Sequence, residues 1–210
     1  MSATLLRSVE GRRIDLEVGR WRLEPDDIEL KLLRSLVGPV LDVGCGPGRI
    51  PAALAAQGRV ALGIDPAPRA AEEASRRGAP VLRRSVFEPL PGEGRWGAVL
   101  LLDGNVGIGG DPITLLERCA NLVRPGGAVV AVVAAPGAAS VPLTVRVESG
   151  RHVGPWFEWA IVGADDWPAI ARAAGLRPEG IETRGTRWFA RAACLGDDRL
   201  PLHGVTLVAM

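Results

Sequence analysis

The segment VLDVGCGPGRI, residues 40–50, decides the fold class of this 210-residue chain. Four apolar or acidic residues at 40–43 lead into glycines at 44, 46 and 48, and a helix-forming stretch, 50–57, follows at once. Glycine permits positive φ and lets a ligand approach the main chain closely. The start of a helix offers free N–H groups and partial positive charge. The segment therefore predicts a strand, a ligand-binding glycine loop and a helix, in that order.

The composition is that of an ordinary globular domain, with 47% hydrophobic residues. With 25 basic and 24 acidic residues and no basic block, nucleic acid is not an expected partner. The cysteines, at 45, 119 and 194, are far apart and form no C-x-x-C pair. We therefore expect neither a disulfide framework nor a metal site.

Nothing in the sequence indicates a membrane or secretory segment. The first twenty residues carry mixed charges without a long apolar core, unlike a secretory signal. The apolar run 128–135 is too short to span a bilayer. We expect no membrane partner, and unpaired cysteines favour a reducing, cytoplasmic location.

From residue 40 onward, short apolar runs alternate with helical stretches. The expected strands are 40–43, 60–65, 81–82, 97–103 and 128–135; the expected helices are 50–57, 67–77 and 112–123, with a turn at 124–127. Strands that are apolar throughout are typical of parallel strands covered on both faces. Strand-helix repetition implies right-handed crossovers, so we predict a doubly wound α/β sheet.

The last third of the chain has a different pattern. Residues 143–149 alternate apolar and polar, and 156–162 can pair with them in a hairpin inserted at about 141–163. A helix is expected at 164–176, then two antiparallel strands around Gly185. The expected division is a helical or lid segment at 1–35, a main domain at 36–195 with the inserted hairpin, and a tail at 196–210.

The glycine spacing separates two classes of ligand. A dinucleotide site requires G-x-G-x-x-G, but counting from Gly44 the third glycine position falls on Arg49. The phosphate-binding pattern G-x-x-x-x-G-K-[ST] is absent. The spacing is instead acidic-x-G-x-G-x-G, beginning at Asp42.

This spacing resembles the first motif of the class I S-adenosylmethionine-dependent methyltransferases. The resemblance covers about residues 36–135, and loosely extends to 194. The segments ALGIDPAP, RRSVFEPLP, WGAVLLLDGNVGIGG and LVRPGGAVVAVV follow in the family's order. The chain is also similar to small actinobacterial-type methyltransferases that carry LLDGN-x-GIGGDP. The resemblance implies a Rossmann-like, seven-stranded, mostly parallel sheet with an antiparallel last strand, in three α/β/α layers.

The resemblance also implies that S-adenosylmethionine is the cofactor and S-adenosylhomocysteine the product. Asp65 would hold both ribose hydroxyls, because one carboxylate can accept two hydrogen bonds. Ser85 and Val86 would border the adenine. The expected cofactor-binding residues are Asp42, Gly44, Cys45, Gly46, Gly48, Asp65, Pro66, Ser85, Val86, Asp103, Gly104 and Asn105.

Several of these roles have alternatives. Asp42 could support the loop or reach the methionine amino group through water. Asp103 and Asn105 could contact that amino group or the acceptor, or only bond the glycine-rich loop. The family often has Asp where Ser85 stands, which leaves a backbone N–H for adenine N1. The motif [DNS]-P-P-[FY] is missing, which argues against adenine or cytosine amino groups as acceptors.

The acceptor side is expected in the hairpin and the N-terminal segment. The candidate acceptor-binding residues are Trp21, Asn105, Arg146, Trp156 and Trp159, although the aromatic residues could simply pack on the sheet. His152 is the hypothesis for a general base, because histidine titrates near neutral pH. A solvated loop histidine is the alternative.

The predicted function is in-line methyl transfer from S-adenosylmethionine to a small-molecule acceptor, by a monomer or homodimer. The alternatives are a non-catalytic S-adenosylmethionine-binding module, a nicotinamide-dependent oxidoreductase, and aminopropyl transfer from decarboxylated S-adenosylmethionine. Neither the acceptor nor the atom that receives the methyl group follows from the sequence.

Overall fold

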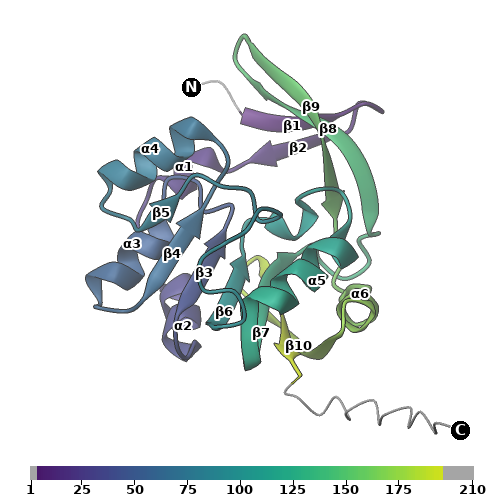
Figure 1. Cartoon of the computed structure of the whole chain (residues 1–210). Coiled ribbons are helices and arrows are strands. Elements are labelled where there is room, and N and C mark those ends of the chain that lie inside the picture. Colours follow the sequence, from purple (N-terminus) through teal and green to yellow (C-terminus); the bar gives the residue numbers. More distant parts are fainter. Residues whose placement is uncertain (1–3, 196–210) are drawn as a thin grey trace, which may run out of the picture.

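Two β-sheets organise the chain, which a computed structural model describes over residues 4–195 (Figure 1). The larger sheet has the order β10-β11-β7-β6-β3-β4-β5. Its strands are β3 (Val40–Val43), β4 (Ala61–Ile64), β5 (Val81–Leu82), β6 (Trp96–Leu101), β7 (Val123–Val133), β10 (Leu176–Arg184) and β11 (Arg187–Cys194). Strand β11 is antiparallel to both neighbours, and the pairs from β7 to β5 are parallel. The predicted sheet, with an antiparallel last strand, is confirmed.

Helices cover both faces of this sheet. Helices α2 (Asp27–Ser35) and α3 (Arg49–Ala56) pack in one buried cluster, and α5 (Pro112–Leu122) and α6 (Trp167–Ala173) pack in the other. Val40 belongs to the first cluster and its neighbour Leu41 to the second. Successive side chains of a strand point to opposite faces, so strands between two helical layers are apolar at nearly every position. Helix α4 (Pro68–Arg76) lies beside the β4–β5 edge, and α1 (Val18–Trp21) is a single short turn.

The turn expected at 124–127 is wrong, because these residues belong to β7. The ladder with β6 shifts register between the pairs Trp96–Val123 and Ala98–Ala128. Strand β7 therefore accommodates the sequence RPGG as extra residues opposite β6, in a bulge rather than a chain reversal.

The second sheet has four antiparallel strands in the order β2-β1-β8-β9. They are β1 (Thr4–Ser8), β2 (Arg13–Leu16), β8 (Val141–Ser149) and β9 (His152–Ile161). The hairpin expected near 141–163 is present as β8 and β9. The helical segment expected at 1–35 is wrong for β1 and β2, because β1 pairs with β8 and β2 pairs with β1. The tail at 196–210 lies outside the described residues.

This second sheet lies over the carboxyl ends of the parallel strands, at the top of Figure 1. One of its faces is apolar: Leu6, Leu143 and Val145 form a buried cluster, with Phe157 and Trp159 packed against it. The space between this face and the large sheet holds the cavities described below. Within residues 4–195, no helix combines the length and apolar character needed to cross a bilayer.

Candidate functional site

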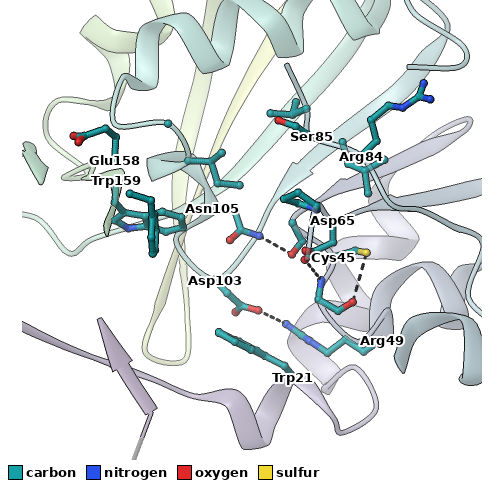
Figure 2. Close-up of a pocket in the computed structure, with 18 residues that line it drawn as sticks. Trp21, Cys45, Arg49, Asp65, Arg84, Ser85, Asp103, Asn105, Glu158 and Trp159 are labelled. Atoms are coloured by element: carbon teal, nitrogen blue, oxygen red, sulfur yellow. Dashed lines mark hydrogen bonds and ion pairs between the residues drawn. The ribbon is translucent and has the colours of Figure 1, made fainter. Parts of the chain in front are cut away.

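A cavity of about 320 Å³ lies where β3, β4 and β6 end, beneath the second sheet (Figure 2). Ligands of open α/β sheets bind at this edge. The cavity brings together eleven of the residues predicted from the sequence: Trp21, Gly44, Cys45, Gly46, Asp65, Pro66, Ser85, Val86, Asp103, Asn105 and Trp159.

The three glycines of the loop serve different purposes. A Cβ on Gly44 would lie 2.7 Å from Nδ2 of Asn105, so this glycine makes room for that side chain. A Cβ on Gly48 would lie 2.7 Å from the Cβ of Ala74, so this glycine lets α4 pack against the loop. Gly46 has φ +53°, and a Cβ there would have no protein atom within 4 Å. Of the three, Gly46 is the one that leaves open space in the cavity wall.

Asp65 presents a fixed carboxylate at the end of β4. Its Oδ2 accepts a hydrogen bond from the Gly46 N–H at 3.0 Å, and its Oδ1 accepts one from the Ala67 N–H at 2.9 Å. Burial raises the pKa of Asp65, while these two backbone hydrogen bonds act to lower it. Each carboxylate oxygen keeps acceptor capacity, so Asp65 can bind two ligand hydroxyls.

Asn105 joins the loop after β6 to the glycine loop. Its Nδ2 donates to the carbonyl oxygens of Val43, at 2.8 Å, and Gly44, at 3.0 Å. Asn105 therefore ties the two loops together, and it also lines the cavity.

Asp103 belongs to a partly buried group of charged side chains. It is the non-glycine residue with positive φ among residues 4–195, at φ +55°. Its Oδ2 accepts from Arg49 Nη2 at 2.7 Å, and its Oδ1 contacts Arg20 Nη2. Arg49 also pairs with Glu29. Residues held in sparsely populated backbone regions often mark functional sites.

Glu29 connects this group to other elements. Its Oε1 accepts from Arg20 Nη1 at 3.0 Å and from Arg187 Nη1 at 2.8 Å. Burial works to lower the pKa of Arg49, but the charges of Asp103 and Glu29 outweigh it, so the pKa is raised. Glu29 and Arg49 are 1% and 3% exposed, and such burial is tolerated because both are paired.

Two of the predicted cofactor residues are buried near the loop. Asp42 does not line the cavity; burial raises its pKa to about 8, although Arg49 opposes this. Cys45 lines the cavity, but burial raises the pKa of its thiol, and the charges of Asp42 and Asp65 add to this. A thiol held in its protonated form is a poor nucleophile.

The predicted acceptor residues divide between two faces of the hairpin. Trp159 faces the cavity, whereas Arg146 and Trp156 lie on the opposite face and line neither this cavity nor the next. Arg146 stacks on the Trp156 ring, 4.7 Å from its centroid, and donates to Glu148 Oε1 at 2.7 Å. These residues are close in the sequence or in the predicted hairpin, but the alternation of side chains along a strand separates them.

A second cavity, of about 640 Å³, adjoins the first. Trp21, Asp103, Phe157 and Trp159 line both cavities. The apolar face of the second sheet supplies Leu6, Leu16 and Val147, and the exposed His152 lines it at the hairpin tip. Gly104 lines neither cavity but a third, of about 230 Å³, between β7 and β9.

Several residues of the site lie outside the motifs visible in the sequence. In the first cavity these are Arg49, Ile64, Arg84, Ile108, Gly109, Phe157 and Glu158. The alternation along β9 was a signal for Phe157, two residues before Trp159. No local pattern indicates that Arg20 reaches Asp103 or that Glu29 reaches Arg187, because these partners are 83 and 158 positions away in the sequence.

The site geometry agrees with a comparison to protein families. A family model described as a methyltransferase domain matches residues 20–179. The chain belongs to this methyltransferase family. The methyltransferase carries the acidic-x-G-x-G-x-G loop and Asp65 at the strand ends, the edge where ligands of open α/β sheets bind. A comparison with curated proteins gave no match.

The methyltransferase shares its fold with solved structures. An S-adenosylmethionine-dependent methyltransferase from Bacteroides fragilis, solved with S-adenosyl-L-homocysteine, has a TM-score of 0.73 at 20% identity over 91% of this chain and 88% of that one. A 1,6-didemethyltoxoflavin-N1-methyltransferase from Burkholderia thailandensis has a TM-score of 0.58 at 22% identity, over 80% of this chain and 75% of that one. A sugar N-methyltransferase from Streptoalloteichus has a TM-score of 0.64 at 20% identity, over 85% of this chain and 90% of that one. At these identities the likeness shows the fold.

The residues of the methyltransferase fit its cofactor. Gly46 leaves open space beside the loop, and Asp65 keeps acceptor capacity for two ribose hydroxyls. Ile64, Val86 and Ile108 provide an apolar surface for a flat base near Ser85. Asp103 lines the same cavity, and its carboxylate pairs with Arg20 and Arg49.

Proposed function

We propose that this methyltransferase transfers the methyl group of S-adenosylmethionine to a small, largely apolar molecule bound in the 640 Å³ cavity. The observation that carries the proposal is the wall that this cavity shares with the cofactor cavity, at Trp21, Phe157 and Trp159. The volume lies in the range of small-molecule sites, roughly 300–1,000 Å³.

The residues around the first cavity suggest how the cofactor is held. We infer that Asp65 binds the ribose hydroxyls and that Asp103 faces the methionine ammonium. The Ser85 N–H already donates to Glu88 Oε2 at 2.6 Å, and the Ser85 hydroxyl accepts from the Phe87 N–H at 3.3 Å. This supports the Val86 N–H as the backbone donor to the adenine.

The chain's part in the reaction is mainly to position and to exclude water. The bound cofactor supplies a methyl group on a positively charged sulfur. Trp21, Phe157 and Trp159 stand where the two cavities meet, so they can keep water away and hold the acceptor in line with the methyl group. Such alignment contributes roughly 7–11 kcal/mol. His152 would accept a proton from a hydroxyl acceptor.

Other observations agree with a small-molecule acceptor. The net charge of +1 provides no basic surface for nucleic acid. The Burkholderia and Streptoalloteichus proteins are named for small-molecule acceptors, a toxoflavin precursor and a sugar. A cytoplasmic location, a monomeric or homodimeric state, and a place in the group with LLDGN-x-GIGGDP remain parts of this proposal.

Calorimetry with S-adenosylhomocysteine tests the cofactor roles. We expect micromolar binding to the wild type and at least tenfold weaker binding to Asp65→Ala, roughly the effect of losing hydrogen bonds to a charged group. Asp111→Ala is the control, because Asp111 caps α5 and lines none of the cavities described above. Equal affinity of wild type and Asp65→Ala would contradict the role of Asp65.

Isotope-labelled methyl transfer tests the acceptor class. Incubation with a panel of small organic molecules, and separately with protein and RNA, should label only small molecules. Trp159→Ala should raise the acceptor KM at least tenfold with little change in cofactor affinity, since it opens the shared wall. Label in protein or RNA would contradict the proposal.

A further inference from the structure

We propose that the acceptor is an aromatic anion, a flat ring that carries an acidic group such as a carboxylate. The inference deepens the proposed function and rests on it, because it takes the 640 Å³ cavity as the acceptor site. The ring would lie against Trp21, Phe157 and Trp159. The acidic group would meet Arg22 and Arg69, which line the same cavity.

Aromatic side chains are concentrated on one wall of this cavity. The chain has six Trp, three Phe and no Tyr, and Trp21, Phe157 and Trp159 all line the cavity and are only partly buried. Phe157 and Trp159 meet edge to face, with their ring centroids 6.2 Å apart. Aromatic rings pack on one another in such edge-to-face or offset contacts. A flat, rigid ligand also loses little conformational freedom on binding, so this wall favours a ring over a flexible chain.

Two carboxylates of the cavity lie on the cofactor side. Asp65 and Asp103 line both cavities, so they stand where the two cavities meet. Asp103 is ion-paired with Arg20 and Arg49, and Asp65 accepts hydrogen bonds from two backbone N–H groups. An anionic group of the acceptor would be repelled by these two carboxylates, so it must lie at the other end of the larger cavity.

That other end carries a surplus of positive charge. Arg22, Arg69 and Glu73 line the larger cavity but not the cofactor cavity, and we call them the rim group. Glu73 accepts from Arg22 Nε at 3.1 Å and from Arg69 Nε at 3.4 Å, so two guanidinium groups share one carboxylate. Within residues 4–195, neither arginine has a second carboxylate at ion-pair distance. His152 also lines only the larger of these two cavities, and it adds no negative charge in either protonation state.

Other carboxylates near the rim group do not cancel this charge. The rim group lies where α1 and α4 are side by side (Figure 1). Glu17, at the start of α1, is paired with Arg20 at 2.9 Å, and Glu24 lies 4.0 Å from Arg77. Glu72 of α4 lines a separate cavity beside β5. One guanidinium charge of the rim group therefore remains for a ligand.

Arg22 is held in position for this role. Its guanidinium donates to both oxygens of Glu73, at 3.1 and 3.3 Å, and its carbonyl oxygen accepts from Arg77. The hydrogen bonds between them raise the pKa of Arg22 and lower that of Glu73, so both stay charged. Each guanidinium has five N–H donors, more than Glu73 can accept. A planar guanidinium binds a carboxylate or similar anion through two parallel N–H groups.

Two fluorescent probes with the same ring skeleton test the proposal. One is 8-anilinonaphthalene-1-sulfonate, an aromatic anion, and the other is N-phenyl-1-naphthylamine, which lacks the sulfonate. Each is titrated into the full-length enzyme saturated with S-adenosylhomocysteine. The readout is the ratio of the two affinities, which does not depend on the folded fraction because both probes bind the same population.

In the double variant Arg22→Gln/Arg69→Gln, the anionic probe should bind roughly tenfold more weakly, because it loses hydrogen bonds to charged groups. The affinity of the neutral probe should not change. Arg22→Lys/Arg69→Lys keeps both charges but loses the planar fork, so its ratio should fall less.

Two variants serve as matched controls. Arg76→Gln removes the same charge from an exposed position of α4 that lines the separate cavity beside β5, so its ratio should equal that of the wild type. Trp159→Leu should weaken both probes to a similar degree, which places them against the aromatic wall. Trp156→Leu, on the opposite face of the same hairpin, should weaken neither.

An unchanged ratio in Arg22→Gln/Arg69→Gln, or an equal fall in Arg76→Gln, would overturn the anion site. Probes that do not bind, or that bind equally well to Trp159→Leu, would overturn the acceptor cavity and the inference with it. In the labelled-methyl assay, aromatic acids should be labelled in preference to their neutral amides, and the reverse preference would contradict the proposal. Label in protein or RNA would overturn the proposed function itself, which distinguishes the two failures.

Discussion

Nδ2 of Asn105 lies 3.0 Å from the carbonyl oxygen of Gly44, and a Cβ on Gly44 would approach that same nitrogen to 2.7 Å. The first glycine of the loop and the asparagine after β6 therefore depend on each other. The contact joins the ends of two neighbouring parallel strands, β3 and β6, at the floor of the cofactor cavity.

Asn105→Ala should destabilise the fold and weaken cofactor binding, because two carbonyl groups lose their donor. We expect a loss of about 1–3 kcal/mol in the free energy of unfolding, measured by thermal or denaturant unfolding, and weaker S-adenosylhomocysteine binding by calorimetry. Asn121→Ala, at an exposed position on α5, is the control and should change neither. An unchanged Tm and Kd in Asn105→Ala would show that the contact is dispensable.

Arg77 should hold the N-terminal segment against the glycine loop. Its guanidinium contacts the carbonyl oxygens of Trp21, Arg22 and Pro47. Arg77→Gln should release this segment, so we expect faster trypsin cleavage after Arg22 and a higher acceptor KM.

Arg76→Gln is the control for this experiment. Arg76 is an exposed arginine at the end of α4, next to Arg77. Its side chain donates only to the carbonyl oxygen of Glu72, in its own helix. Its cleavage rate should match the wild type. If trypsin cleaves Trp21–Leu23 in Arg77→Gln no faster than in the wild type, Arg77 does not tether this segment.

Stability should decrease as pH rises, because of Asp42. Burial raises its folded-state pKa to about 8, above the unfolded value of about 3.9. The folded protein therefore binds more protons between these limits, so the stability contribution is full below about pH 4 and is lost as pH rises through about 8. Asp42→Asn does not ionise. The Tm of Asp42→Asn relative to the wild type should therefore increase from pH 5 to pH 8.5. The expected increase is about 2–4 °C for each 1 kcal/mol of unfolding free energy that the wild type loses.

Asp111→Asn provides a comparison in which the pH dependence of stability has the opposite sign. Hydrogen bonds from the Thr114 hydroxyl and backbone lower the pKa of Asp111, so its contribution is present above its unfolded pKa and is lost on acidification. The wild-type advantage over Asp111→Asn should therefore disappear at low pH. A Tm difference for Asp42→Asn that does not vary with pH would contradict the assignment to Asp42.

His152→Ala tests the general-base hypothesis once an acceptor is known. For a hydroxyl acceptor, turnover should fall by roughly 10²–10⁴-fold, with unchanged S-adenosylhomocysteine affinity, because His152 lines the larger cavity and not the cofactor cavity. Arg151→Ala, the neighbouring residue at the hairpin tip, should keep full turnover. Turnover of His152→Ala equal to the wild type would refute the role.

Local patterns were enough to predict the large sheet. Runs such as 40–43 and 97–103 are apolar at each or nearly each position because helices cover both faces, and this requirement is visible in sequence. Gly46 and Asp65 were predictable because a strand end, a glycine and an acidic residue have a fixed spacing along the chain. The likeness of the chain to its family rests on the same spacing.

Other features depended on partners far away in the sequence. The strand character of β1 arises from pairing with β8, more than 120 residues later, and β2 pairs in turn with β1. The separation of Trp159 from Trp156 depended on which face of β9 meets the large sheet.

The sequence by itself determined the doubly wound sheet, the glycine loop and the carboxylate at Asp65, because short-range spacing encodes them. Only the tertiary structure decided which charges meet at Asp103. Ion pairs such as Arg20–Asp103 and Arg187–Glu29 join residues 83 and 158 positions apart. No period or motif reports such pairs, since they form only when packing buries the groups and removes the water that would otherwise screen them.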